Sequence, residues 1–300
     1  MAKRWRQQVN RALGLSADRD SSGAEAGAAL PGPVPPAGLV PAEPGSRLLA
    51  DPVFIICSVR SGSTLLRMLL NAHPAVHAPH ELHLGGLQVH AASKRTAAAF
   101  TELDISSVEL EHLLWDRVLH RELQRSGKQV LVEKTPNNAL IWPRLACCWP
   151  QARFLFLLRH PATVAASWAD AHQGQRSEAE VLAKVLKSMR AVEEARRNLP
   201  GLIVRYEDVT VDPMGQTQRI CRFLDLPWDP AMLDYLPEEP TFTRGLGDWR
   251  EKIRSGRVQA ARPLPPGPLH PDLRNLCTAW DYLPAEPGAA DRVPRRLSVR

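Results

Sequence analysis

The sequence predicts an α/β fold in which helices flank a parallel sheet. Short apolar runs, such as Val53–Cys57, alternate with longer stretches that have helical periodicity. A strand of a parallel sheet is buried on both faces, so it appears in the sequence as an unbroken apolar run. The chain has 300 residues, of which 44% are hydrophobic and 23% are charged, and this is enough to bury one core.

The expected elements follow one another as strand, helix, strand. Strands are expected at residues 53–57, 129–132, 153–158 and 202–206. Helices are expected at residues 63–70, 108–124, 139–149, 162–171, 178–199 and 213–224. Pro161 lies in the first turn of a helix, which a proline tolerates, whereas Pro143 interrupts the regularity of its segment. Alternating strands and helices form a doubly wound sheet, which binds ligands at the carboxyl ends of its strands.

The chain is expected to fold as a single domain with tails. Residues 1–46 begin with a basic stretch and continue with a segment rich in Ala, Gly, Pro and Ser. Such a composition cannot bury a core, so this part is predicted to be a disordered N-terminal tail or a linker. We therefore expect the folded domain at residues 47–285 and a basic C-terminal tail at residues 286–300.

Composition and charge argue against several classes of protein. The five cysteines are an odd number without a C-x-x-C pair, which disfavours a disulfide framework and indicates a reducing compartment. No apolar run reaches the length of a membrane span, and the start lacks the apolar region of a secretory signal, so a cytoplasmic protein is expected. The net charge is +6, but basic residues do not form blocks with interleaved aromatics, so no nucleic-acid partner is expected.

The segment Arg60-Ser61-Gly62-Ser63-Thr64 separates the first strand from the first helix. A glycine there lets the backbone turn sharply, and the amides of the new helix can then face an anion. The Ser and Thr hydroxyls and the guanidinium of Arg60 add donors. A plain corner with Ser or Thr as helix caps is the alternative. A Walker A loop would need a lysine before the hydroxyl pair, and this segment has none.

Three later segments carry weaker signals for anion binding. Arg159 ends the third strand, and Ser167 lies eight positions further on in the next helix. Tyr206 lies at the end of the fourth strand, in Arg205-Tyr206-Glu207-Asp208. A glycine turn at residues 245–252 is followed by cations. Each of these features alone is more often structural than functional.

In this order, the loop at residues 60–64, Arg159 with Ser167, the Arg-Tyr-Glu-Asp strand and the late Gly-Asp-Trp-Arg resemble PAPS-dependent sulfotransferases. PAPS is 3′-phosphoadenosine 5′-phosphosulfate. The resemblance covers residues 53–252 and is to the bacterial branch, which is similar to tyrosylprotein and secondary-metabolism sulfotransferases. It implies a P-loop-like fold.

The resemblance also implies a donor site. The residues implied at the 5′-phosphosulfate are Arg60, Ser61, Gly62, Ser63, Thr64 and Leu65. Arg159 and Ser167 are implied at the 3′-phosphate. Arg244 and Arg250 are further candidates there, although the stretch at 242–250 departs from the family's C-terminal signature. Tyr206 and Trp249 are candidates for adenine contacts, with core packing as the alternative for both.

For the chemistry, the resemblance implies Arg60 and Lys134 as cations beside the transferred group and Glu81 as the general base. His83 and His80 stay open as alternative bases, because other branches of the family use a histidine. A metal site in the histidine-rich segment at residues 73–83 is the competing interpretation. Side-chain cations can do the work of a metal ion in this reaction, so no metal is expected.

We therefore expect a sulfotransferase that moves the sulfuryl group of PAPS to a hydroxyl of a small molecule and releases PAP, adenosine 3′,5′-bisphosphate. A natural-product acceptor is the first hypothesis. A kinase or other phosphotransferase is one alternative, but it would need Mg²⁺ and the absent Walker lysine. A non-catalytic nucleotide-binding protein is the other. The sequence does not fix the oligomeric state.

Overall fold

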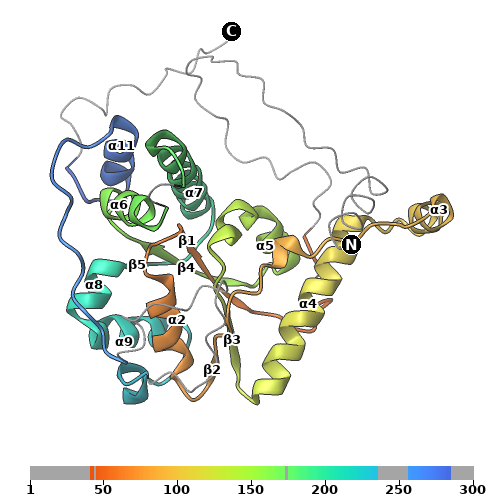
Figure 1. Ribbon diagram of the computed structural model, residues 1–300. Coiled ribbons are helices and arrows are strands. Elements are labelled where there is room, and N and C mark those ends of the chain that lie inside the picture. Colours follow the sequence, from red (N-terminus) through yellow and green to blue (C-terminus); the bar gives the residue numbers. More distant parts are fainter. Residues whose placement is uncertain (1–40, 44, 173–174, 236–255, 285–300) are drawn as a thin grey trace, which may run out of the picture. The chain divides into compact units, whose positions relative to one another are not determined.

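The computed structural model describes residues 41–43, 45–172, 175–235 and 256–284. Its sheet has five strands in the order β2-β3-β1-β4-β5, and every pair is parallel (Figure 1). The strands are β1 (Val53–Cys57), β2 (Val76–His77), β3 (Val130–Glu133), β4 (Arg153–Leu158) and β5 (Leu202–Arg205). The predicted α/β class, with a parallel sheet flanked by helices, is confirmed.

The register of the strands aligns the carboxyl ends of β1, β4 and β5. Cys57 pairs with Leu157, and Leu158 pairs with Arg205, so β1, β4 and β5 end at nearly the same level. On the other side of β1, strand β3 ends three residues earlier, because its last residue, Glu133, pairs with Phe54. The connections that leave these strands therefore meet at one end of the sheet.

Helices cover both faces of the sheet. On one face lie α2 (Ser63–Asn71), α8 (Tyr206–Val211) and α9 (Pro213–Phe223), which share a core with Val53, Ile55 and Cys57 of β1. On the other face, α4 (Ser107–Ser126), α5 (Trp142–Cys148), α6 (Pro161–Ala171), α7 (Glu178–Asn198) and α11 (Pro271–Ala279) pack around Phe54 and Ile56 (Figure 1). Every residue of β1 is buried, because alternate side chains of a strand enter opposite faces.

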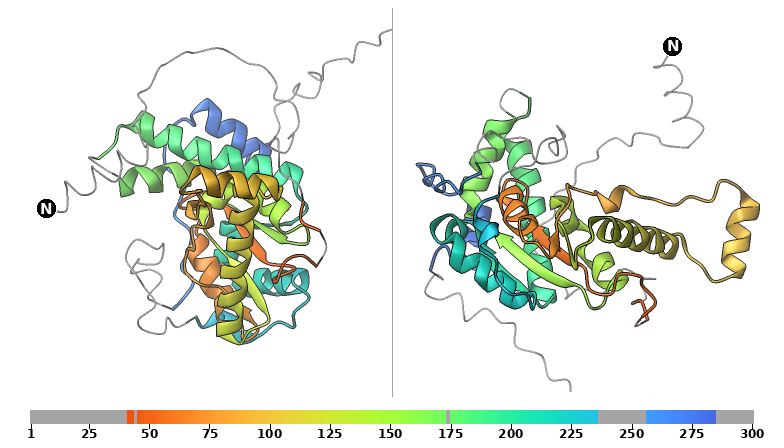
Figure 2. Two further views of the ribbon diagram at one scale, coloured as in Figure 1. Left: turned by 90° about the vertical axis from the view of Figure 1, so that its right-hand side faces the viewer. Right: turned by 90° about the horizontal axis from the view of Figure 1, so that it is seen from below.

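Several elements differ from the sequence-based expectation. The helix expected at residues 139–149 is two elements, the short η2 (Pro136–Leu140) and α5, because Pro143 occupies the first turn of α5. Helix α3 (Lys94–Glu102) was not expected, since none of its residues is buried; it stands apart from the sheet (Figure 2). Tyr206 begins α8 and does not extend β5.

The remaining short elements are η1 (Leu84–Gly86) and η3 (Pro230–Leu233). No helix among the described residues is long and apolar enough to cross a membrane. The expectations for residues 1–40 and for the basic C-terminal tail lie outside the described residues. The boundaries at 46/47 and 285/286 stay predictions.

Candidate active site

The loop between β1 and α2 turns through two left-handed residues. Arg60 has a φ of 64° and Gly62 a φ of 87°. Ser61 is fully buried, and its hydroxyl donates to the carbonyl of Ser58 at 2.8 Å, which closes the turn. Gly62 is the N-cap of α2 and has no side chain to cap the helix. This helix start therefore presents backbone amides and a positive dipole end to the carboxyl edge of the sheet.

Two residues that the sequence places about a hundred positions away converge on this loop. The Nε of Arg60 donates to the hydroxyl of Ser167 at 3.3 Å. Nη1 of Arg159 donates to the backbone carbonyl of Arg60 at 2.9 Å. Ser167 and Arg159 therefore both contact Arg60, and the prediction that Arg159 and Ser167 bind one phosphate stays a prediction.

Arg159 is a buried cation in unusual surroundings. The residue is 8% exposed, and its Nε is buried without a hydrogen-bond partner in the part of the chain that the structure describes. Within the same residues no carboxylate forms an ion pair with it. Burial lowers the pKa of Arg159. A buried guanidinium that lacks a carboxylate partner is suited to receive an anionic ligand.

Tyr206 lies against the glycine of the loop. The guanidinium carbon of Arg159 is 4.4 Å from the centre of the Tyr206 ring, within the range of a cation–π contact. A Cβ atom added to Gly62 would lie 2.1 Å from Cδ2 of Tyr206. The ring therefore packs under the loop and beside Arg159, a position that sequence reasoning did not foresee.

The packing of Tyr206 against Gly62 leads to a prediction about stability. Gly62→Ala is expected to destabilise the protein by about 1–2 kcal/mol for the left-handed backbone and by a further ~1–3 kcal/mol for the collision with Tyr206. Gly127→Ala is the matched control, because Gly127 has a φ of +65° and nothing within 4 Å of an added Cβ. Urea unfolding should therefore show a clearly larger loss for Gly62→Ala, and equal losses would contradict the packing of Tyr206 on the loop.

A second set of contacts holds the end of β4. The backbone amide of His160 donates to Oε1 of Glu207 at 3.0 Å, and the hydroxyl of Tyr282 donates to Oε2 at 2.6 Å. Burial and the neighbouring Glu207 raise the pKa of Tyr282, so its phenol keeps its proton. These contacts fix the backbone next to Arg159. No sequence motif pointed to Tyr282, which comes from the segment after α11.

Lys134 and Glu81 form the third part of the site. Nζ of Lys134 lies 2.5 Å from Oε1 of Glu81, and the Lys134 side chain is fully buried while that of Glu81 is 12% exposed. Nε2 of His83 lies 3.5 Å from Oε2 of the same carboxylate, and the His83 side chain is 45% exposed. Lys134 and Glu81, which the family resemblance implied as a cation and a base, thus form an ion pair, and His83 lies at its solvent side.

Cys57, the last residue of β1, lies between this pair and the loop at residues 60–64. Burial raises the pKa of its thiol to about 11, and the positive charge of Lys134 is the strongest influence in the opposite direction. The hydroxyls of Ser61 and Ser63 act on the pKa of this thiol in the same direction as Lys134. Lys134, Glu81 and the start of α2 are thus neighbours around one strand end.

Other sequence-predicted candidates have different surroundings. His80 is exposed, and its Nδ1 lies 3.1 Å from the carbonyl of Glu81. His73 is buried between the Pro227 carbonyl and the Ala75 amide, which is a structural role. No group of three metal-ligating side chains lies together among the described residues. Arg244, Trp249 and Arg250 lie outside them.

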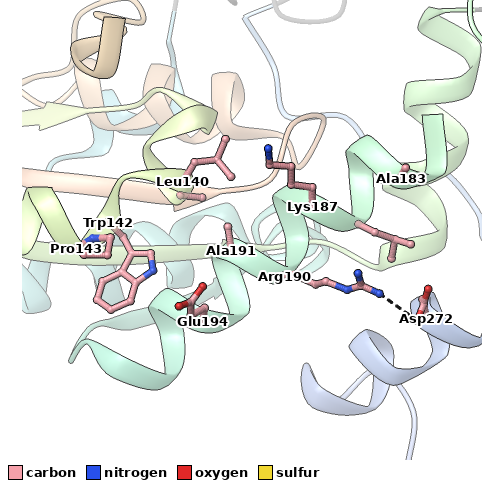
Figure 3. A pocket seen from close by; sticks show the side chains of 11 residues that line it. Leu140, Trp142, Pro143, Ala183, Lys187, Arg190, Ala191, Glu194 and Asp272 are labelled. Atoms are coloured by element: carbon pink, nitrogen blue, oxygen red, sulfur yellow. Dashed lines mark ion pairs between the residues drawn. The ribbon is translucent and has the colours of Figure 1, made fainter. Parts of the chain in front are cut away.

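A groove of about 680 Å³ lies on the helical face formed by η2, α5, α7 and α11 (Figure 3). Leu140 and Trp142 line one side of it, and on another side Arg190 forms an ion pair with Asp272 at 3.2 Å. Lys187 and Glu194 also line this groove. It shares no residue with the Arg60, Arg159 and Glu81 site.

The strand–glycine turn–helix arrangement at the centre of a parallel sheet defines a P-loop-like α/β protein. The chain belongs to the sulfotransferase family, whose model matches residues 52–230. Among curated proteins it is similar to the nodulation protein NoeE of Sinorhizobium fredii, at 28% identity over 229 residues, covering 64% of this chain and 54% of that protein. The chain thus spans about half the length of this relative.

It is also similar to protein-tyrosine sulfotransferase 1 of Danio rerio, at 26% identity, covering 71% of this chain and 62% of that protein. Two solved structures share its fold. One is the sulfotransferase domain from the curacin biosynthetic pathway, with a TM-score of 0.55, 21% identity and coverage of 78% of this chain and 99% of that chain. The other is the sulfotransferase domain of the Synechococcus PCC 7002 olefin synthase, with a TM-score of 0.57, 23% identity and coverage of 83% of this chain and 98% of that chain.

Proposed function

We propose that this protein transfers the sulfuryl group of PAPS to a hydroxyl of a small-molecule acceptor and releases PAP. The observation that carries the proposal is the convergence of Arg60, Ser167 and the buried Arg159 on the start of α2. Family membership supports the same reaction class. The donor, the acceptor and the residue roles below are parts of this proposal.

The donor fits two anion-binding groups. The amides and hydroxyls of residues 61–65, together with Arg60, bind the 5′-phosphosulfate at the dipole end of α2. Arg159 and Ser167 bind the 3′-phosphate. A nucleotide without a 3′-phosphate leaves the buried Arg159 guanidinium without its charged partner, so the site discriminates against ATP.

The reaction needs a base and cations around one strand end. The Glu81 carboxylate takes the proton from the acceptor hydroxyl, whose oxygen forms a bond to sulfur. The bond from sulfur to the bridging phosphate oxygen breaks, and its electron pair leaves with PAP. Arg60 and Lys134 stabilise the negative charge that develops on the transferred group and the leaving oxygen.

The Lys134–Glu81 ion pair requires that the donor binds before Glu81 can act as the base. In the structure Lys134 occupies one oxygen of the base. When the Lys134 ammonium bonds to the phosphosulfate, Glu81 loses this partner and becomes free to accept a proton. The donor therefore binds before the base is active, which limits proton abstraction in the absence of a sulfuryl group.

The acceptor is proposed to be a small hydroxylated molecule of natural-product type, and the protein is proposed to work in the cytoplasm. The test incubates the full chain with PAPS and EDTA, and with either a simple phenol or a β-hydroxyacyl thioester as the probe. Mass spectrometry should find a sulfated probe and an equal amount of PAP. Nucleotide binding without a sulfated product or PAP formation would favour a non-catalytic nucleotide-binding protein.

A further inference from the structure

A fully buried carboxylate lies directly beneath the segment that carries Glu81. Glu133, the last residue of β3, is 0% exposed. Its Oε1 accepts hydrogen bonds from the amide of Leu82 at 3.2 Å and from the hydroxyl of Thr135 at 2.6 Å. Its Oε2 accepts from the side-chain amide of Asn138. Burial raises the pKa of Glu133, and these donors oppose that effect.

Thr135 extends the same network by one residue. Its hydroxyl oxygen accepts a hydrogen bond from the amide of His83 at 3.2 Å while donating to Glu133. His83 has a φ of 51°, a left-handed conformation that a residue with a Cβ seldom adopts. The two amides that follow Glu81 are therefore both held from β3, and they fix the backbone through this turn.

Lys134 lies between Glu133 and Thr135 in the chain and contacts the side chain of Glu81. Glu133 and Thr135 bind the backbone after Glu81, whereas Lys134 pairs with the Glu81 side chain at 2.5 Å. Successive side chains of an extended segment point to opposite sides. One end of β3 can thus hold both the backbone and the carboxylate of the Glu81 segment.

We propose that Glu133 is a positioning residue for the base Glu81, acting through the Leu82 amide and through Thr135. This inference rests on the proposed function. Glu133 takes no part in proton transfer, because it is buried and its carboxylate is occupied by three donors. Its role is to fix where the Glu81 carboxylate lies relative to Lys134 and the acceptor.

The test compares two substitutions at Glu133. Glu133→Met removes the acceptor atoms and is expected to lower kcat by about 100-fold, the size of effect that follows from displacing a reacting group by about 1 Å. Glu133→Gln is the conservative control. Its amide oxygen still accepts from Leu82 and Thr135, and Asn138 can rotate its amide to accept from the new NH₂ group, so most of kcat should be retained.

Two further readouts separate positioning from general damage. The KM for PAPS and the dissociation constant of PAP should be nearly unchanged in both variants, because Glu133 is not part of the phosphate loop. Amide hydrogen exchange of a peptide that contains Leu82 and His83 should be faster in Glu133→Met and near wild type in Glu133→Gln. Exchange is measured without an acceptor and is independent of the proposed function.

The outcomes are distinct. A Glu133→Met protein with unchanged kcat and a lower melting temperature would overturn the inference, because Glu133 would then serve stability alone. Equal losses in both variants would also overturn it, since charge and not hydrogen-bond geometry would be responsible. A wild-type chain that neither binds PAP nor sulfates a probe would overturn the proposed function, whatever the exchange result.

If Glu133→Met does not fold, Thr135→Val and Thr135→Ser provide the same comparison. Thr135→Val removes the acceptor of the His83 amide, whereas Thr135→Ser keeps the hydroxyl. A loss of kcat in the first variant and activity in the second would support positioning through this network. Full activity in Thr135→Val would contradict it.

Discussion

Glu81→Gln is expected to lower kcat by about 10²- to 10⁴-fold, the contribution of a general base, while PAP binds as in the wild type. The amide of Gln keeps the shape of the side chain and can still accept a hydrogen bond from Lys134, but it cannot take a proton from the acceptor. The loss should therefore appear in the chemical step. Single-turnover sulfation of a phenol probe measures that step, and calorimetry with PAP measures binding.

The control for this prediction is His83→Gln. His83 lies 3.5 Å from Glu81 on its solvent side, so replacing its imidazole should leave most of the activity. If Glu81→Gln stays active and His83→Gln does not, the base is His83 and the assignment of Glu81 is wrong. Equal and partial losses in both variants would contradict a single base at Glu81.

Arg159→Gln is expected to remove most of the affinity for PAP. Loss of one partner from a buried, hydrogen-bonded charge pair costs about 2–5 kcal/mol, which corresponds to a loss of about 30-fold to several-thousand-fold in affinity. ADP has no 3′-phosphate, so its affinity should be nearly the same in both proteins. The quantity to measure is the ratio of the PAP and ADP dissociation constants, by calorimetry, in wild type and variant.

Arg153→Gln is a matched control on the same strand. Arg153 begins β4, and its guanidinium forms exposed ion pairs with Asp51 at 3.0 Å and Asp225 at 3.2 Å. Exposed pairs of this kind contribute little, and this end of β4 is opposite to Arg159. Both nucleotides should bind Arg153→Gln as they bind wild type. A similar loss of PAP and ADP affinity in Arg159→Gln would mean that Arg159 supports the loop and does not recognise the 3′-phosphate.

The apolar strands were the most predictable part of the fold. The expected strands at 53–57 and 153–158 agree with β1 and β4 to the residue, because an unbroken apolar run has few alternatives in a chain of this size. Strand β2 was not expected, since its two residues, Val76 and His77, carry no periodicity. Helix α3 was missed because without a buried face it has no apolar stripe to reveal it.

Residues of the candidate site could be predicted only where polar or charged side chains come directly after a strand. The loop at residues 60–64, Arg159 and Lys134 follow β1, β4 and β3, so the parallel topology places them at the same end of the sheet. The supports of the site could not be predicted in the same way. Tyr206 against Gly62 and Tyr282 on Glu207 are contacts between distant segments, and a single sequence does not show which side chains become neighbours.

Glu133 illustrates the same limit. A Glu beside a Lys at the end of a strand is typical of a solvent-exposed pair, and only the structure shows that Glu133 is buried and bonded to the segment after Glu81. The run Glu133, Lys134 and Thr135 does carry a signal, because three consecutive polar residues come after the apolar residues of a strand. That signal indicates a polar strand end, but not which segment it holds.

The most direct test of the proposed donor is a thermal-shift comparison of PAP, ADP and Mg·ATP. PAP is measured in EDTA, and each ligand is titrated against the full chain. The expected result is a rise in melting temperature with PAP and little change with the other two, since a ligand at about 100 times its dissociation constant adds about 2.7 kcal/mol of stability. Stabilisation by Mg·ATP without an effect of PAP would contradict the assignment of both phosphate-binding groups and make a phosphotransferase the better account.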